Sequence, residues 1–194
     1  MESRKPNESQ LRGLSPVFTG SYDRALDAKM RFALPREFRQ LLPEEVAVLY
    51  VTPGLDGALA LYTPDAFHEL AGRLALQSPT KRTVRNFSRL FYSQAYRCEL
   101  DRQGRLRISQ GLADLAGLRR EITLVGVRDY IEVWDAVRWN EFCEQELEQY
   151  DNFAEQAFSG EWGSGPPEPA GEAEAGVTAR PTEEGFLQAS RKPK

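Results

Sequence analysis

The sequence predicts a β-rich α+β fold built from two tandem repeats with short helices, and three observations support it. When the chain is shifted by 74 residues, Tyr22–Phe38 lies over Tyr96–Leu112. Apolar and polar residues alternate with a period of two at the start of each copy, and residues that begin or end helices recur at matching places. Each copy is therefore expected to contain a β-hairpin, a short helix, two strands and a longer helix, in that order.

Identical residues anchor the comparison of the two copies. Four such pairs coincide: Tyr22 with Tyr96, Leu26 with Leu100, Asp27 with Asp101, and Arg31 with Arg105. Farther along, Val48–Val51 lies over Ile122–Val125, and after a two-residue gap Ala58–Phe67 lies over Tyr130–Trp139. The elements therefore recur in one order.

The second hairpin has the clearer pattern. Tyr96, Cys98 and Leu100 are separated by polar residues, and Leu106 and Ile108 continue the apolar face after a turn at residues 102–104. This period of two is typical of a half-buried β-hairpin, whose turn presents arginines to solvent.

Helix signals follow each hairpin. Pro35 begins a short helix that Pro43 ends, and residues 109–116 repeat this segment with Gly117 as a C-cap. Thr63 and Asp135 are expected to be the N-caps of two longer helices. The longer helices cover apolar residues at helical spacing: Phe67, Leu70 and Leu74 in the first copy, and Trp139, Cys143, Leu147 and Tyr150 in the second.

The ends of the chain differ in composition from its middle. Residues 1–16 form a polar arm, and residues 159–194 are rich in Pro, Gly and Glu, so we expect both to be disordered. The first repeat with its linker helix spans 17–90, and the second with its C-terminal helix spans 91–158. No apolar run reaches the ~20 residues that a bilayer crossing needs, and no signal-peptide core is present. We expect a cytoplasmic protein without membrane partners.

Charge is segregated along the chain although the net charge is only −4. Nine basic and two acidic residues lie between Arg73 and Ser109, whereas six acidic residues and no basic one lie between Glu141 and Glu155. A basic row on the linker helix is the best candidate for pairing with the acidic last helix, within a chain or between chains: Lys81, Arg85 and Arg89. A protein that is acidic overall can still present a basic face to DNA.

Catalytic and metal-binding patterns are lacking. The only histidine, His68, has no cysteine or second histidine near it, and Cys98 and Cys143 lie on apolar faces, where they act as small hydrophobic residues. Asp56 and Asp129 lie in predicted loops without partners. We therefore expect no enzyme, no cofactor, no metal and no small-molecule substrate. Aromatic residues at matching repeat positions are assigned to the core: Tyr62, Phe67, Trp134 and Trp139.

Four segments together resemble the MraZ family over about 140 consecutive residues: Phe18–Arg39, Leu49–Phe67, Phe87–Ser109 and Gly117–Trp139. The hallmark is a D-x-x-x-R signature that occurs twice at equivalent points of the repeat. The resemblance implies an AbrB-like swapped-hairpin (double-split) β-barrel, in which the two halves of one chain correspond to the two subunits of AbrB or MazE dimers. It also implies a ring-like homo-oligomer, associated with the nucleoid, that regulates transcription of the bacterial cell-division and cell-wall gene cluster. The implied target is tandem short G-rich repeats in double-stranded DNA.

The hairpin tips are the expected DNA-binding sites, since arginine can contact both phosphates and guanine edges. Each aspartate could hold the arginine four residues later across the turn; a plain surface ion pair that only firms the turn is the alternative. The candidate residues are Asp27, Lys29 and Arg31 at the first tip, and Asp101, Arg102, Arg105 and Arg107 at the second.

Two positions depart from the family pattern. Met30 stands where the motif usually has glycine, so we expect a different turn geometry in the first hairpin, and Ser109 replaces the more usual proline as a helix N-cap. The family-like segment begins at Phe18, so we expect the functional start near Val17.

A second function stays open: a protein-binding module in the manner of MazE, which presents the disordered tail to a partner.

Overall fold

The structure is a computed structural model that describes residues 17–43 and 46–158. The expectations for the arm 1–16 and the tail 159–194 lie outside the described residues. Internal contacts divide the chain into two units, 1–148 and 149–194, and each is described by itself. Helix α7 (Tyr150–Ala157) belongs to the second unit, and all other elements below belong to the first, apart from a short 3-10 turn (Leu147–Gln149) at the boundary.

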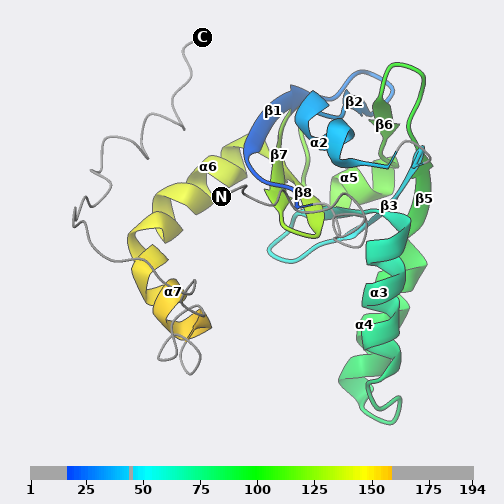
Figure 1. Cartoon of the computed structure of the whole chain (residues 1–194), viewed down its shortest axis with the longest axis vertical. Helices are drawn as coiled ribbons and strands as arrows, with labels where there is room; N and C mark the ends of the chain where they lie inside the picture. The colour runs from blue at the N-terminus through cyan, green and yellow to red at the C-terminus, as the bar shows by residue number, and fades with distance from the viewer. Residues whose placement is uncertain (1–16, 44–45, 159–194) are drawn as a thin grey trace, which may run out of the picture. The chain divides into compact units, whose positions relative to one another are not determined.

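The two copies contain the predicted elements in the predicted order (Figure 1). The first copy and the linker comprise β1 (Ser21–Ala25), β2 (Arg31–Ala33), α2 (Arg36–Leu41), β3 (Val48–Pro53), β4 (Leu59–Tyr62), α3 (Pro64–Ala75) and α4 (Arg82–Gln94). The second copy comprises β5 (Tyr96–Glu99), β6 (Arg105–Arg107), α5 (Gln110–Leu115), β7 (Glu121–Val127), β8 (Tyr130–Asp135) and α6 (Ala136–Glu146). The prediction of a β-rich fold with short helices is therefore confirmed.

The main sheet interleaves strands from the two copies. Its order is β1-β7-β8-β4-β3-β5, with every pair antiparallel. Strand β1 of the first copy pairs with β7 of the second, and β5 of the second pairs with β3 of the first. The equivalent strands β4 and β8 pair at the centre, and β2 pairs with β6 in a separate two-stranded sheet. Only the β3–β4 and β7–β8 pairs lie within one copy, so neither copy can form the two sheets alone.

The predicted hairpins close at their turns, but their arms do not form a regular two-stranded ladder. Before the turn at residues 101–105, β5 belongs to the six-stranded sheet, and after it β6 pairs with β2 of the other copy. The first copy behaves in the same way, because β1 pairs with β7 and β2 with β6. The apolar period of two predicted the strands correctly, but it carries no information on which other strand each of them pairs with.

The structure also corrects the alignment of the repeat in β3 and β7. Leu49 and Val51 face the core as Ile122 and Leu124 do, which is a shift of 73 residues rather than 74. The shift of 74 would place half-buried Val48 over fully buried Ile122, and a slip of one residue in a strand exchanges its two faces. The loop after α2 is thus one residue longer than the loop after α5.

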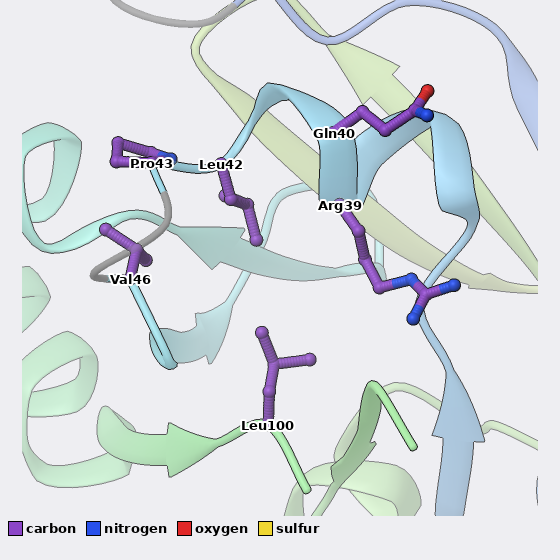
Figure 2. Close-up of a pocket in the computed structure, with 6 residues that line it drawn as sticks. All are labelled: Arg39, Gln40, Leu42, Pro43, Val46 and Leu100. Carbon is purple, nitrogen blue, oxygen red and sulfur yellow. The ribbon is translucent and has the colours of Figure 1, made fainter. Parts of the chain in front are cut away.

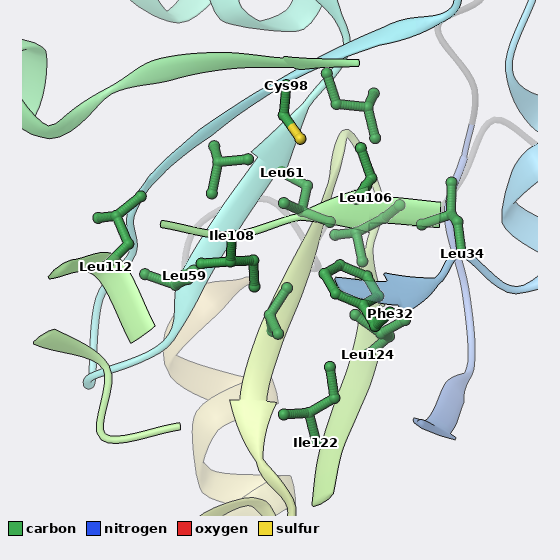
Figure 3. Close-up of a cluster of buried hydrophobic side chains, with 14 of the residues drawn as sticks. Phe32, Leu34, Leu59, Leu61, Cys98, Leu106, Ile108, Leu112, Ile122 and Leu124 are labelled. Atoms are coloured by element: carbon green, nitrogen blue, oxygen red, sulfur yellow. The ribbon is translucent and has the colours of Figure 1, made fainter. Parts of the chain in front are cut away.

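The core lies between the two sheets. Phe32 of β2 and Leu106 of β6 point into it, together with inward residues from the six-stranded sheet such as Leu59, Ile122 and Leu124 (Figure 3). All five are less than 2 % exposed. Alternate residues of each strand supply this face, as their apolar patterning predicted.

Aromatic contacts hold two helices to the outer face of the main sheet. Phe67 of α3 stacks on Tyr50 of β3 with ring centroids 4.2 Å apart. Trp139 of α6 packs against Trp134 of β8 at 5.6 Å. Of the predicted core aromatics, Trp134 is buried, whereas Phe67, Trp139 and Tyr62 are half-buried, the last against Tyr130.

The predicted helix caps are confirmed. The Thr63 hydroxyl accepts a hydrogen bond from the Ala66 N–H, and the Asp135 carboxylate accepts bonds from Val137 and Arg138. Gly117 follows α5 with φ +61°, the left-handed conformation of a helix C-terminus. The predicted last helix is not continuous to Tyr150, because the 3-10 turn separates α6 from α7.

Candidate nucleic-acid interface

The two D-x-x-x-R turns have the same hydrogen-bond pattern. In the first, Asp27 Oδ1 accepts from the backbone N–H groups of Lys29 (2.8 Å) and Arg31 (3.0 Å). Asp27 Oδ2 accepts from Arg31 Nε at 2.8 Å and from its Nη2 at 2.7 Å. A backbone bond of 2.8 Å from Asp27 N–H to the Arg31 carbonyl closes the turn. One carboxylate therefore fixes both the turn and the arginine side chain.

The second turn repeats each of these bonds. Asp101 accepts from the backbone of Gln103 (2.9 Å) and Arg105 (3.0 Å), and from Arg105 Nε (2.8 Å) and Nη2 (2.7 Å). The Arg31 and Arg105 side chains are 29 % and 30 % exposed. Each arginine is thus held by its aspartate, as the sequence analysis allowed, and is partly buried where exposed turn arginines were expected.

The expectation that Met30 imposes a different turn was wrong. Met30 has φ +57° and Gly104 has φ +71°, so both turns place this residue in the left-handed region. The Met30 N–H donates to the Asp27 carbonyl at 2.9 Å, as Gly104 does to Asp101 at 2.8 Å. A non-glycine residue in this conformation costs about 1–2 kcal/mol. The side-chain and backbone bonds to Asp27 hold Met30 there, and its side chain packs against the core.

Both aspartates are charged at neutral pH. The hydrogen bond from the Arg31 side chain lowers the pKa of Asp27 from 3.8 to about 2. The corresponding bond from Arg105 also lowers the pKa of Asp101. Each turn therefore keeps its ion pair over the whole physiological pH range.

Pairing of β2 with β6 brings the two turns together. Phe32 lies opposite Leu106 on the inner face, so the outer face carries Arg31 opposite Arg107, and Ala33 opposite Arg105. The ladder continues into the turns, because Leu34 N–H donates to the Gly104 carbonyl and Ile108 N–H to the Met30 carbonyl, both at 2.9 Å. With a rise of about 3.4 Å per residue, Arg31 and Arg105 lie about 7 Å apart along the strand direction.

A family model described as "MraZ protein, putative antitoxin-like" matches residues 17–90 and 91–159 of the chain. The chain belongs to the MraZ family. This is a family of regulator-type proteins rather than of enzymes. The two matched segments each contain one of the D-x-x-x-R turns.

The outer face of the β2–β6 pair in this MraZ-family chain is unusually basic. Arg31 and Arg107 are directly opposite, an arrangement that is destabilising for like charges unless another group compensates it. Arg107 is exposed, and so are Lys29 and Arg102 at the two turns. The side chains of these three residues make no hydrogen bond or ion pair with another described residue. The pairing thus gathers Arg31, Arg105 and Arg107 on one face, while Lys29 and Arg102 lie at its two ends.

Tyr96 is a structural residue of this site that the sequence did not single out. Its hydroxyl donates to the Arg107 carbonyl at 2.6 Å and accepts from the Ser109 N–H at 3.0 Å. Cys98 Sγ also contacts the Arg107 carbonyl, at 3.1 Å. Burial raises the pKa of Tyr96 to about 12, so the hydroxyl remains a donor. The alternation had indicated only that both side chains face inward.

A shallow pocket of about 330 Å³ adjoins the second turn (Figure 2). It is lined by Arg39, Gln40, Leu42, Pro43, Val46 and Leu100. Figure 2 shows Arg39 extending away from α2, on the side of the helix that faces the segment of Leu100. The sequence analysis did not select Arg39.

The described part of the chain has no metal-ligand cluster and no helix that could span a membrane. No group of three or more His, Cys, Asp or Glu side chains there could hold a metal ion. No helix within residues 17–43 and 46–158 has the length and apolar character of a membrane span. His68 is exposed, and Cys98 is buried and Cys143 half-buried, both as free thiols.

Proposed function

We propose that this MraZ-family chain is a sequence-specific DNA-binding transcriptional regulator. Its target is tandem short G-rich repeats of the cell-division and cell-wall gene cluster, which it contacts through the two D-x-x-x-R turns and the outer face of the β2–β6 pair. The observation that carries this proposal is the pair of identically held arginines, Arg31 and Arg105, on one face.

The way each aspartate holds its arginine suits base recognition. Asp27 and Asp101 occupy the Nε and Nη2 side of each guanidinium. The Nη1–Nη2 edge of both groups remains for a second planar partner, such as the O6 and N7 atoms of guanine. An arginine that is fixed before binding loses less entropy when it meets a base. A simple turn-firming ion pair would not require that the fold also place these arginines side by side.

The interlocked strand pairs support the fold that the family resemblance implies. The β1–β7, β5–β3 and β2–β6 pairs each join the two copies. This is the arrangement expected when the two halves of one chain replace the two subunits of a dimer with exchanged hairpins. These pairs support the AbrB-like swapped-hairpin barrel that we propose for the chain.

Exposed apolar side chains on two helices support a homo-oligomer. On α4, Phe87 and Leu90 are 47 % and 68 % exposed beside the basic row of Lys81, Arg85 and Arg89. On α6, Val137 and Phe142 are exposed beside acidic residues, and within the described residues no ion pair joins the two helices. Contact of α4 with α6 of a second copy would pair these charges and cover both apolar faces. Such a head-to-tail contact closes into a ring when its rotation permits.

The competing protein-binding function gains no support from the described residues. It depends on the tail 159–194, which lies outside them. We propose a location in the cytoplasm at the nucleoid, no enzymatic activity, and double-stranded DNA and the chain itself as partners.

The test is fluorescence anisotropy with a duplex of tandem G-rich repeats and a scrambled duplex, each at two salt concentrations. Loss of one bidentate base contact costs about 1–3 kcal/mol, so Arg31→Ala should weaken cognate binding by roughly 5- to 150-fold per site and reduce discrimination. Lys29→Ala should weaken both duplexes alike and lower the salt dependence, as a phosphate contact does. The cognate affinity of Asp27→Asn should lie between those of Arg31→Ala and Lys29→Ala, because the substitution loosens the Arg31 side chain without removing it.

Arg73→Ala is the matched control, because Arg73 is an exposed arginine on α3 whose one ion pair with a described residue is a surface contact with Glu69 at 4.0 Å. It should bind like the wild type. Circular dichroism checks that every variant is folded. If folded Arg31→Ala keeps wild-type affinity and discrimination, the turns are not the DNA-binding site.

A further inference from the structure

Arg39 of the first repeat reaches across to the turn of the second repeat. A Cβ atom placed on Gly104 would lie 2.5 Å from Arg39 Nη1, 2.8 Å from its Cδ and 3.1 Å from its Cζ. The first two distances are shorter than real Cβ contacts, so the Arg39 side chain occupies the space above Gly104. Because Met30 takes φ +57° at the equivalent place, the φ of +71° alone does not require glycine, and the room that Gly104 leaves for Arg39 is the particular reason for glycine here.

The first turn has the opposite arrangement. By the repeat shift of 74 residues, Met30 corresponds to Gly104, and Ala113 of α5 corresponds to Arg39 of α2. Ala113 is fully buried, and Met30 packs against the core to which Ala113 belongs. In one copy the bulky side chain comes from the turn, and in the other it comes from the helix. The exchange makes the second turn more basic by one arginine.

Arg39 has a charge that no other described residue neutralises. The residue is exposed, and its side chain makes no hydrogen bond or ion pair with another described residue. It thereby joins Arg102 and Arg105 at the second turn, where the first turn has Lys29 and Arg31. Its position beside Leu42 and Leu100 lets the alkyl stem pack while the guanidinium stays at the surface.

We propose that Arg39 is a DNA-phosphate contact of the second turn, supplied by the first repeat across the β2–β6 pair. The inference rests on the proposed DNA-binding function. Arg105 is held by a carboxylate and so has the fixed plane that base recognition requires. Arg39 has no described carboxylate to fix its plane, which suits a phosphate, where charge matters more than orientation. The contact also gives the first repeat a part in the binding surface of the second turn.

The first experiment measures the salt dependence of binding to a fluorescein-labelled, random-sequence 30-base-pair duplex. Arg39→Ala should weaken binding and reduce the slope of log K against log salt by about 0.9 for each Arg39 that contacts a phosphate. Arg36→Ala is the control, because Arg36 is an exposed arginine of the same helix without a described partner. It should keep the wild-type slope.

The second experiment tests the contact itself without DNA. Gly104→Ala should lower the melting temperature of the wild type more than that of the Arg39→Ala protein, since backbone strain is common to both but the clash with Arg39 is not. Equal decreases in the two backgrounds would overturn the contact.

The outcomes separate this inference from the function on which it rests. If the wild type binds no duplex, both fail. If the wild type binds but Arg39→Ala keeps its slope and affinity, only the role of Arg39 is refuted. A loss in Arg39→Ala that Arg36→Ala reproduces also refutes it, because general charge would then explain the effect.

Discussion

Replacement of Asp135 by asparagine should remove a pH-dependent part of the stability of this MraZ-family fold. Asp135 caps α6, and its carboxylate also accepts hydrogen bonds from the Arg119 backbone N–H at 3.1 Å and from Arg119 Nε at 3.0 Å. The side chain is only 1 % exposed. These bonds, that from the Arg119 side chain above all, lower the pKa of Asp135 from 3.8 to about 2.

The magnitude follows from the linkage between protonation and folding. A lowered pKa in the folded state stabilises the protein fully above the unfolded pKa of 3.8, and the stabilisation is lost as pH falls through about 2. A difference of about two units corresponds to on the order of 2 kcal/mol. Asparagine still caps a helix, so the charge-dependent part is removed while much of the cap remains.

The assay is urea unfolding followed by circular dichroism at pH values from 7 to 2. The stability difference between wild type and Asp135→Asn should shrink by on the order of 2 kcal/mol between pH 5 and pH 2. Glu144→Gln, which changes an exposed residue of the same helix without a described partner, is the matched control and should differ little from the wild type in stability. A stability difference for Asp135→Asn that stays constant over this range would refute the reasoning.

Two further predictions concern the β7–β8 turn and the thiols. Arg128 has φ +56° at the first position of a two-residue turn, where glycine is favoured, so Arg128→Gly should raise the stability by about 1 kcal/mol in thermal unfolding; a lower melting temperature would contradict this. Burial raises the pKa of both thiols, so the native protein should react slowly with a disulfide reagent at pH 7.5, and Cys98 more slowly than Cys143 because it is the more buried. Single Cys→Ala variants assign the two rates, and a fast reaction at Cys98 would show that its strand opens readily.

The sequence predicted the elements because local signals determine them. Thr63, Asp135 and Gly117 act at helix ends through their own side chain or backbone, and all three were predicted correctly. Alternation in a strand reports which residues face inward, and the structure bears this out for Phe32 and Leu106.

The strand partners could not be predicted in this way. Pairing of β2 with β6, and of β1 with β7, depends on contacts between residues far apart in the chain, which periodicity does not encode. The slip of one residue between β3 and β7 escaped detection because identical residues anchored the alignment only in the hairpins.

The candidate site was predicted as separate residues but not as a surface. The repeated D-x-x-x-R motif identified both ion pairs. Their geometry is local, because four bonds to one carboxylate hold each turn and its arginine. Arg31 lies opposite Arg107, and Arg39 extends over Gly104, only because strands of the two copies pair with each other. The expectation for Met30 failed because the left-handed conformation costs a non-glycine residue only about 1–2 kcal/mol, and the hydrogen bonds of the turn can offset that cost.

The most direct test of the central claim is a genome-wide chromatin immunoprecipitation comparison in the native host. The wild-type chain is compared with an Arg31→Ala/Arg105→Ala double variant that is expressed at the same level. The account predicts that the wild type is enriched at tandem G-rich repeats upstream of cell-division and cell-wall genes, and that the double variant loses this enrichment. Equal enrichment of the two proteins at the same sites, or no enrichment of the wild type at any site, would contradict the account.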